Sequence, residues 1–217
     1  MLIEYGVILA AGRGSRMGNA TDLTPKALLP KQEDCLLKRQ ITFLRPHVMN
    51  LFVTVGYLGE KVKEFSLTNG ADQTIDTSGH GNAYFLQSPK MLGAAGKRLL
   101  VITCDNLMEA PLGEILYFDS HLDPGITLVT RIDKVNSPGD RVIIDESHQV
   151  LAIGQDLVSN NLASGLQIID YDFATLCHVE DFKELWSYAL KHSVLRVSPL
   201  KPSKWNAFDT LDSLKSY

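Results

Sequence analysis

Short runs of β-branched residues alternate along this chain with longer segments whose apolar residues recur at helical spacing. The short runs predict strands at residues 3–9, 51–55, 98–103, 126–132, 141–144, 149–153, 166–169 and 194–197. The longer segments predict helices at residues 36–45, 60–66, 83–92, 112–120, 182–192 and from 211 onward. Alternation of this kind is typical of a parallel α/β sheet with right-handed crossovers.

The runs at 141–144 and 149–153 differ from the others because only a short polar segment joins them. Such a connection favours an antiparallel hairpin inserted into an otherwise parallel sheet. We therefore expect a mixed, mostly parallel, Rossmann-like α/β sheet flanked by helices. The 217 residues contain no internal repeat, low-complexity tract or proline-rich linker, so residues 1–217 are expected to form a single domain.

Charge and cysteine usage limit the partners and the compartment. A formal net charge of -4 argues against a general phosphate-backbone binder, so no nucleic-acid partner is expected. Cys35, Cys104 and Cys177 lie far apart without metal-ligand spacing, which suits a reducing cytosol. The first apolar run is about seven residues, too short for a membrane span. A cytoplasmic protein without a membrane partner is expected, and its oligomeric state stays open.

The most informative segment directly follows the first predicted strand and reads LAAGRGSRMG at residues 9–18. At the carboxyl end of a parallel strand, glycines let the backbone approach a ligand, and successive N–H groups can surround an anion. Arg13, Arg16 and Lys26 add positive charge to this segment. The pattern favours a phosphate site, and a simple tight turn is the alternative.

Two common phosphate motifs do not fit this loop. A Walker A loop has Lys-Ser or Lys-Thr directly after its second glycine, and residues 12–18 contain no such pair. A dinucleotide-binding turn has the spacing GxGxxG, whereas the glycines here are spaced GxGxxxG and Pro25 interrupts the expected helix. P-loop chemistry is therefore disfavoured, and hydride transfer is the weaker alternative.

The loop together with PKALLP at residues 25–30 resembles the signature of the sugar-nucleotide and related nucleotidyltransferases, the NTP-transferase superfamily that includes MobA-like domains. The resemblance implies that Arg16 and Lys26 bind the triphosphate as the catalytic residues. It also implies that the loop holds the nucleotide, through Leu9, Ala10, Ala11, Gly12, Arg13 and Gly14. Lys26 is expected to be an exposed loop residue.

A lone carboxylate, Asp105, follows the predicted strand 98–103, where an open α/β sheet presents its ligand crevice. The resemblance implies a Mg²⁺ ligand here, although Cys104 replaces the usual preceding glycine. The segment WNAFDTLDSL at 205–214 resembles the family's W-x-D-I-D-T-P-E-D-L, which implies Asp209 as the second ligand and leaves Ala207 where many hexose-1-phosphate members have one. Two aspartates, phosphates and waters suit Mg²⁺. Each aspartate has helix or turn capping as its alternative.

Three further segments, at residues 79–84, 141–145 and 153–165, resemble the cytidylyltransferases that act on inositol-1-phosphate. This resemblance implies that Gly81 and Asn82 lie near the base, with a glycine turn and a helix cap by Asn82 as the alternative. It further implies an acceptor site at Ser164 and Gly165. His80 is expected to be a solvent-facing loop residue, and Gln155 replaces a lysine of that group.

These observations predict a Mg²⁺-dependent nucleotidyltransferase whose partners are an NTP and a small phosphomonoester such as a polyol or sugar phosphate. CMP is the favoured transferred group, and pyrophosphate is released. A sugar-1-phosphate guanylyl- or uridylyltransferase is one alternative. A catalytically impaired nucleotide-binding module is another, because Cys104, Ala207 and Gln155 depart from the family pattern.

Overall fold

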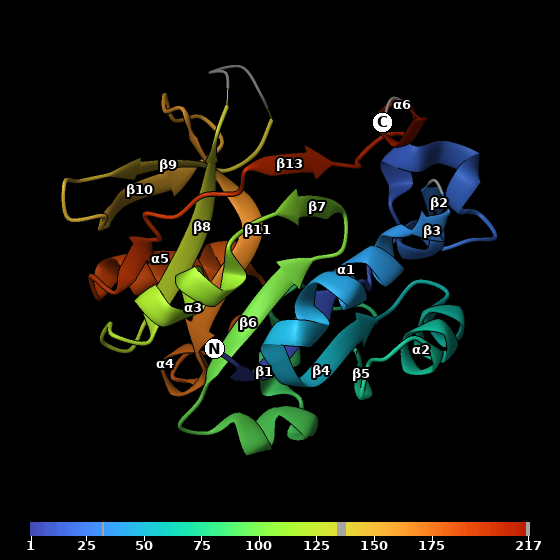
Figure 1. Ribbon diagram of the computed structural model, residues 1–217, viewed down its shortest axis with the longest axis horizontal. Coiled ribbons are helices and arrows are strands. Elements are labelled where there is room, and N and C mark those ends of the chain that lie inside the picture. Colours follow the sequence, from blue (N-terminus) through green and yellow to red (C-terminus); the bar gives the residue numbers. More distant parts are fainter. Residues whose placement is uncertain (32, 134–137, 216–217) are drawn as a thin grey trace.

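The computed structural model describes residues 1–31, 33–133 and 138–215. Its main sheet comprises strands β1 (Ile3–Leu9), β4 (Val48–Val55), β5 (Gln73–Asp76), β6 (Arg98–Thr103), β8 (Ile126–Ile132), β9 (Arg141–Ile144), β10 (Val150–Gly154), β11 (Asn161–Asp170) and β12 (Leu195–Val197). The strand order is β10-β9-β11-β6-β1-β4-β5, and β8 pairs with both β11 and β12 (Figure 1).

Strand β1 occupies the centre of the parallel part of this sheet. It pairs in parallel with β4 and β6, and Leu9 at its end lies opposite Thr54 and Thr103. These three strands therefore end at the same edge of the sheet. Strands β11 and β10 run opposite to the others, and β9 and β10 form the expected hairpin. The mixed, mostly parallel sheet is confirmed.

Helices cover both faces of the sheet because successive side chains of each strand point to opposite faces. Ile8 belongs to one buried cluster and Val7 to the other. Helices α1 (Leu36–Leu44), α2 (Gly59–Thr68) and α3 (Leu112–Asp119) contribute to the first cluster, whereas α4 (Tyr171–Thr175) and α5 (Phe182–Lys191) contribute to the second. Each fully buried Leu or Ile side chain contributes about 1.5–3 kcal/mol, so this double core holds the sheet against its helices.

The predicted helix at 83–92 is wrong. Two 3-10 turns, η4 (Tyr84–Gln87) and η5 (Pro89–Ala94), occupy this stretch, and Ser88 between them is extended. Pro89 lacks an N–H group and disfavours the helical conformation of the residue before it, so one continuous helix cannot form.

Several short elements were not expected from the sequence. These are β5, α4, the small ladder of β2 (Pro30–Lys31) with β3 (Asp34–Cys35), and the ladder of β7 (Asn106–Glu109) with β13 (Lys204–Ala207). The terminal helix α6 (Leu211–Lys215) is present, and Figure 1 shows it beside the blue N-terminal segment. The β7–β13 ladder brings the C-terminal segment to the end of β6.

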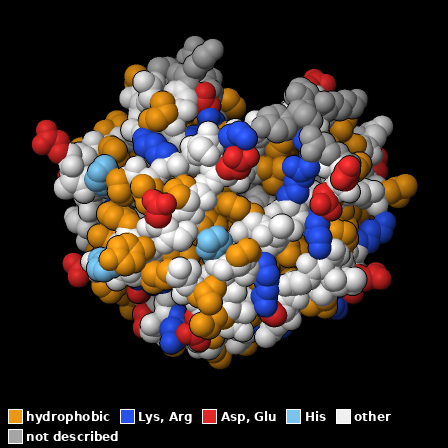
Figure 2. All heavy atoms as spheres, viewed as in Figure 1, with side chains coloured by type: hydrophobic (Ala, Val, Ile, Leu, Met, Phe, Trp, Pro, Cys, Tyr) orange, Lys and Arg blue, Asp and Glu red, His pale blue; other side chains and the backbone are white. Residues whose placement is uncertain are grey.

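One face of the molecule can be followed in the space-filling view. On the face in Figure 2, acidic and basic side chains are interspersed among neutral and hydrophobic groups. Across the described ranges, no helix has both the length and the apolar character needed to cross a membrane.

Candidate active site

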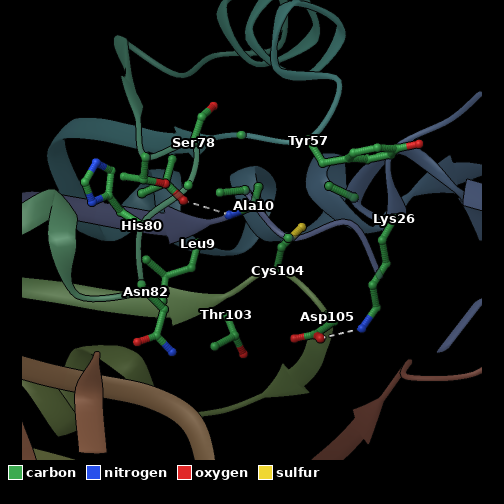
Figure 3. A pocket seen from close by; sticks show the side chains of 18 of the residues that line it. Leu9, Ala10, Lys26, Tyr57, Ser78, His80, Asn82, Thr103, Cys104 and Asp105 are labelled. Carbon is green, nitrogen blue, oxygen red and sulfur yellow. Dashed lines mark hydrogen bonds and ion pairs between the residues drawn. The ribbon is translucent and has the colours of Figure 1, made fainter. Parts of the chain in front are cut away.

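A cavity of about 640 Å³ opens at the edge of the sheet where β1, β4 and β6 end. It brings together many of the residues predicted to form the site. These are Leu9, Ala10, Ala11, Gly12, Lys26, Gly81, Asn82 and Asp105. Figure 3 shows Lys26 and Asp105 on one side of this cavity and His80 and Asn82 on the other.

The glycine-rich loop forms one wall of the cavity, and hydrogen bonds to β4 and to the turn after it hold the loop in place. The Ala10 N–H donates to Oγ1 of the buried Thr54 at 3.0 Å, and the Tyr57 N–H donates to the Ala11 carbonyl at 3.0 Å. Within the described parts of the chain, the amides of residues 12–14 have no hydrogen-bond acceptor. Such unsatisfied amides on an exposed loop are suited to bind phosphate oxygens.

The loop at residues 77–82 forms the opposite wall, and it is fixed to the start of α5. The Gly81 N–H donates to Glu180 Oε2 at 3.1 Å, and Asn82 Oδ1 accepts from the Phe182 N–H at 3.0 Å. Asn82 therefore caps a helix 100 residues away in the sequence. The His80 ring stacks on the Tyr84 ring with a centroid separation of 3.6 Å. The His80 side chain is about half exposed and lines the cavity.

The charged centre of the site is the ammonium of Lys26 between two carboxylates. Its Nζ lies 2.5 Å from Asp105 Oδ2 and 3.0 Å from Asp209 Oδ1. The Lys26 side chain is only 11% exposed, so the expectation of an exposed loop lysine is wrong. The two ion pairs explain its position: Lys26 turns inward because both carboxylates need a nearby positive charge.

The β7–β13 ladder explains why Asp105 and Asp209 meet although they lie far apart in the sequence. The ladder ends with the Phe208 N–H donating to the Asp105 carbonyl at 3.0 Å, which sets the two carboxylates side by side. The buried amide of Gln40 donates to the carbonyls of Thr103 at 3.2 Å and Asn106 at 2.6 Å. Helix α1 therefore fixes the turn that contains Asp105.

The donor set of this centre fits Mg²⁺. Because both carboxylate oxygens contact the same Lys26 nitrogen, Asp105 and Asp209 present convergent hard oxygen ligands. Over the described ranges, no group of three or more His, Cys, Asp or Glu side chains is placed to hold a metal. A two-carboxylate site of this kind leaves positions for phosphate oxygens and water.

The two loop arginines lie outside the lining of the cavity. Arg16 donates to Asp209 Oδ1 at 2.9 Å, and its side chain is mostly exposed. Arg13 pairs with Asp22 at 3.3 Å and lies 5.1 Å from the centroid of the Tyr57 ring. The structure thus brings Arg16 to the charged centre, whereas Arg13 and the neighbouring Gly14 lie at the rim.

A second cavity of about 780 Å³ adjoins the first, and Asn82 and Thr103 line both. Asp209 and Gly165 also line this second cavity. The structure places Ser164 differently, because its buried hydroxyl donates to the Val129 carbonyl at 2.7 Å. The charged centre therefore lies where the two cavities meet.

Gly165 lets the backbone of β11 lie close to the Thr103 side chain at the end of β6, beside the second cavity. Its φ of +86° lies in the left-handed region, and a Cβ atom there would collide with Asn106 Nδ2 and Thr103 Oγ1. Both features require glycine at this position. The side chains of Thr103 and Asn106 consequently remain hydrogen-bonded to each other, at 2.6 Å, beside the cavity.

Aromatic and cationic side chains form the far wall of the second cavity. The Arg131 guanidinium lies 3.6 Å from the centroid of the Trp205 ring and pairs with Asp133. The Trp186 Nε1–H donates to Gln167 Oε1 at 2.9 Å, which orients that amide. Figure 1 shows β13, which contains Trp205, crossing near the end of β8. This wall offers both stacking surfaces and hydrogen-bond donors.

The sequence did not single out several residues of these cavities. Thr54, Tyr57, Arg131 and Trp186 are ordinary members of a strand, a turn or a helix, and no local motif marks them. A polar threonine inside the apolar run of β4 was the one available signal, because a buried hydroxyl needs a partner.

Comparisons with known proteins show similarity to a family model and to curated relatives. Residues 6–108 match the family model of the MobA-like NTP transferase domain. The bifunctional protein GlmU of Methanococcus maripaludis is 25% identical over 220 residues, which cover 96% of this chain and 46% of that protein. The chain thus spans about half the length of the curated relatives that it matches along most of its length.

Two solved structures share the fold. A glucose-1-phosphate thymidylyltransferase candidate from Bacillus anthracis superimposes with a TM-score of 0.82 at 17% identity, covering 98% of this chain and 93% of that one. The inositol-1-phosphate CTP transferase from T. maritima superimposes with a TM-score of 0.78 at 19% identity, covering 100% and 93%.

The chain shares the fold of the solved nucleotidyltransferase structures on which it superimposes. More particularly, residues 6–108 contain the pattern of a MobA-like NTP transferase domain. The resemblance inferred from the glycine-rich loop and the PKALLP segment is thereby confirmed.

Proposed function

We propose that this protein is a Mg²⁺-dependent nucleotidyltransferase that transfers CMP from CTP to a small phosphomonoester and releases pyrophosphate. The observation that supports this most directly is the Lys26 ammonium between Asp105 and Asp209 at the junction of two cavities. A transfer between two substrates needs one charged centre that both substrates can reach, and this arrangement supplies it.

The first cavity is the proposed NTP site. The amide of Gly12 in the wall and the amides of residues 13 and 14 at the rim are available to the triphosphate, and Lys26 neutralises its charge from the inner side. The base lies between Leu9 and the loop that contains Gly81 and Asn82. Catalysis then depends on positioning and on charge neutralisation, which dominate phosphoryl-type transfers.

In the proposed reaction, a phosphate oxygen of the acceptor attacks the α-phosphorus of CTP. A new P–O bond forms as the bond to the β-phosphate oxygen breaks, and pyrophosphate leaves with the electron pair. Asp105 and Asp209 would hold Mg²⁺, which supplies Lewis-acid stabilisation of phosphate charge when bound. Lys26 and Arg16 stabilise the pentavalent transition state, and no covalent enzyme intermediate is needed.

The second cavity is the proposed acceptor site. The guanidinium of Arg131, paired with Asp133, is a cation in its wall that can turn toward a phosphate, and the amide groups of Gln167 and Asn206 can bind hydroxyl groups. Gln155, where the inositol-phosphate group of enzymes usually has lysine, is exposed and does not line this cavity. Arg131 is therefore the candidate that replaces that lysine in attracting a polyol or sugar phosphate.

Two features support CTP as the nucleotide. The sequence segments 79–84 and 153–165 resemble cytidylyltransferases, and an inositol-1-phosphate CTP transferase superimposes along the whole chain. The Gly81 N–H donates to Glu180 Oε2 at 3.1 Å, a contact that fixes the loop assigned to the base.

A pyrophosphate-release assay tests the proposal. The protein is incubated with CTP, UTP, GTP, ATP or dTTP and with inositol-1-phosphate, glucose-1-phosphate or no acceptor, with Mg²⁺ or with EDTA. Acceptor-dependent release that needs Mg²⁺ and is fastest with CTP supports the proposal. Preference for GTP or UTP would assign a sugar-1-phosphate guanylyl- or uridylyltransferase. Nucleotide binding without release under any condition would indicate an impaired nucleotide-binding module.

A further inference from the structure

A fully buried lysine, Lys31, lies outside both cavities and has no role in the reaction described above. It occupies the second position of β2 and is 2% exposed, which makes it one of the largest completely buried side chains of the protein. Burial lowers the pKa of Lys31, and the positive charge of Arg39 lowers it further. Lysine is almost never fully buried unless its ammonium has partners, so the position of Lys31 requires an explanation.

Two partners of the Lys31 ammonium lie on the segment that contains Asp209. Its Nζ donates to the Leu214 carbonyl at 2.6 Å, within the terminal helix α6. The same ammonium lies 4.8 Å from the centroid of the buried Phe208 ring, within the range of a cation–π interaction. Phe208 directly precedes Asp209 and Leu214 follows it by five residues, so Lys31 contacts the chain on both sides of this carboxylate.

The segment that Lys31 contacts is short and follows the last rung of the β7–β13 ladder. We call residues 208–214 the carboxylate arm. The N–H of Ser213 donates to Thr210 Oγ1 at 3.2 Å, a contact that caps α6 from within the arm. The pairs of Asp209 with Arg16 and Lys26 involve groups that are expected to turn toward phosphate in the reaction. The contacts of Lys31 do not depend on that exchange, so they can hold the arm throughout it.

We propose that Lys31 is a positioning residue that anchors the carboxylate arm and thereby sets the affinity of the site for its divalent cation. This inference rests on the proposed function, because it takes Asp209 as a metal ligand. Lys31 does not touch the nucleotide cavity. Its loss is therefore expected to weaken metal binding while leaving metal-free nucleotide binding intact.

The test compares Lys31→Met with the unchanged protein. Methionine keeps the length and apolar character of the side chain and removes only the ammonium. Mn²⁺ binding is titrated by electron paramagnetic resonance in the presence of a CTP analogue with a methylene group between the α- and β-phosphorus atoms. We expect Mn²⁺ to bind about tenfold more weakly, the size of effect found when an outer partner of a metal ligand is lost. Binding of the analogue in EDTA, measured by calorimetry, should stay the same within about twofold.

A second test variant and a control variant accompany Lys31→Met. Phe208→Leu removes the aromatic partner and keeps the lysine, so it should weaken Mn²⁺ binding in the same direction even where Lys31→Met fails to fold. Lys63→Met is the matched control, because Lys63 is an exposed lysine of α2 paired with Glu60 at 3.3 Å, and its loss should change neither measurement.

The outcomes separate this inference from the proposed function. Unchanged Mn²⁺ affinity in both Lys31→Met and Phe208→Leu would overturn the positioning role, even if the melting temperature fell. An equal loss of analogue binding in EDTA would also overturn it. If the unchanged protein binds Mn²⁺ no better than Asp105→Asn does, the proposed metal site itself fails.

Discussion

The Lys26 ammonium lies 2.5 Å from Oδ2 of Asp105, at the end of the central strands and at the point where the two cavities meet. The same nitrogen contacts Asp209, which also accepts from Arg16, so Lys26 is the positive charge that the two carboxylates share when no cation is bound. A lysine in this position can exchange partners, because bound Mg²⁺ would compensate the carboxylates and free the ammonium for the triphosphate. This exchange makes Lys26 important both for stability without metal and for turnover.

Replacement of Lys26 by alanine is expected to reduce pyrophosphate release by about 10²-fold or more, because a charge-stabilising donor is lost. Without Mg²⁺ the variant should also lose about 1–3 kcal/mol of unfolding free energy, since the partly buried Asp105 carboxylate loses its ion pair beside Asp209, which keeps only Arg16. Urea denaturation with and without Mg²⁺ measures this loss, which Mg²⁺ should largely remove. Lys63→Ala serves as the surface control, and near-normal turnover of Lys26→Ala would refute the assignment.

Asp105→Asn and Asp209→Asn should each abolish most Mg²⁺-dependent activity, and the double variant should be little slower than either single variant. The reason is that two ligands of one ion act as a unit, so removal of the second costs little once the first is gone. Steady-state rates at several Mg²⁺ concentrations for all three variants give the comparison. Mild, additive losses would show instead that the two carboxylates have only structural roles with Lys26 and Arg16.

Much of the sheet could be predicted because its signals are local. Strands β1, β6, β8 and β9 have the predicted bounds, since runs of β-branched residues mark them without reference to any partner. The helix at 83–92 was wrong because helical periodicity was given more weight than Pro89. The ladder of β7 and β13 was missed because each strand is short and its partner lies about 100 residues away. Only tertiary pairing reveals such strands.

The same distinction applies to the candidate site. The glycine-rich loop and Lys26 form a contiguous signature, so their meeting at one cavity could be anticipated from the sequence. Thr54, Gln40 and Arg131 could not, because each acts through a contact with a distant segment. The burial of Lys31 could not be predicted for a related reason. A lysine in a loop is normally exposed, and the burial of this one depends on where the carboxylate arm folds.

Gly81→Ala is expected to destabilise the wall of the NTP cavity. A Cβ atom at this position would collide with the Glu180 carbonyl oxygen, so the loop or the start of α5 must move. Such overpacking costs about 1–3 kcal/mol, and it should also weaken nucleotide binding because the displaced loop lines the cavity.

Gly113→Ala is the matched control for this change. Gly113 lies in α3, and no atom lies within 4 Å of the position that a Cβ atom would take there, so alanine should stabilise the helix by about 0.5–1 kcal/mol. Chemical denaturation of both variants, with nucleotide affinity measured in parallel, gives opposite signs if the geometry is right. Equal stability of the two variants would contradict the close approach of Gly81 to Glu180.

The thiol of Cys104 is expected to be unreactive although it stands next to Asp105. Burial raises its pKa well above the ordinary value, and the negative charge of Asp105 raises it further. Only the thiolate attacks an alkylating agent, so at about pH 8 the folded protein should keep its activity in iodoacetamide while the unfolded protein is labelled at all three cysteines. Mass spectrometry identifies the labelled sites. Rapid labelling of Cys104 together with inactivation would show that this part of the cavity is open to solvent.

CTP with Mg²⁺ is expected to raise the melting temperature more than GTP with Mg²⁺ does, because a ligand stabilises the folded state according to its affinity for that state. The loop proposed to bound the base is fixed by the Gly81 N–H, which donates to Glu180 Oε2 at 3.1 Å, and segments 79–84 and 153–165 resemble those of cytidylyltransferases. Differential scanning fluorimetry with CTP, UTP and GTP at the same total concentration compares the three shifts. UTP is the close competitor because its ring has the same size, so discrimination against it depends on hydrogen bonds to the base edge. A larger shift with GTP would reassign the protein to guanylyl transfer while leaving Arg16, Lys26, Asp105 and Asp209 in the roles proposed for them.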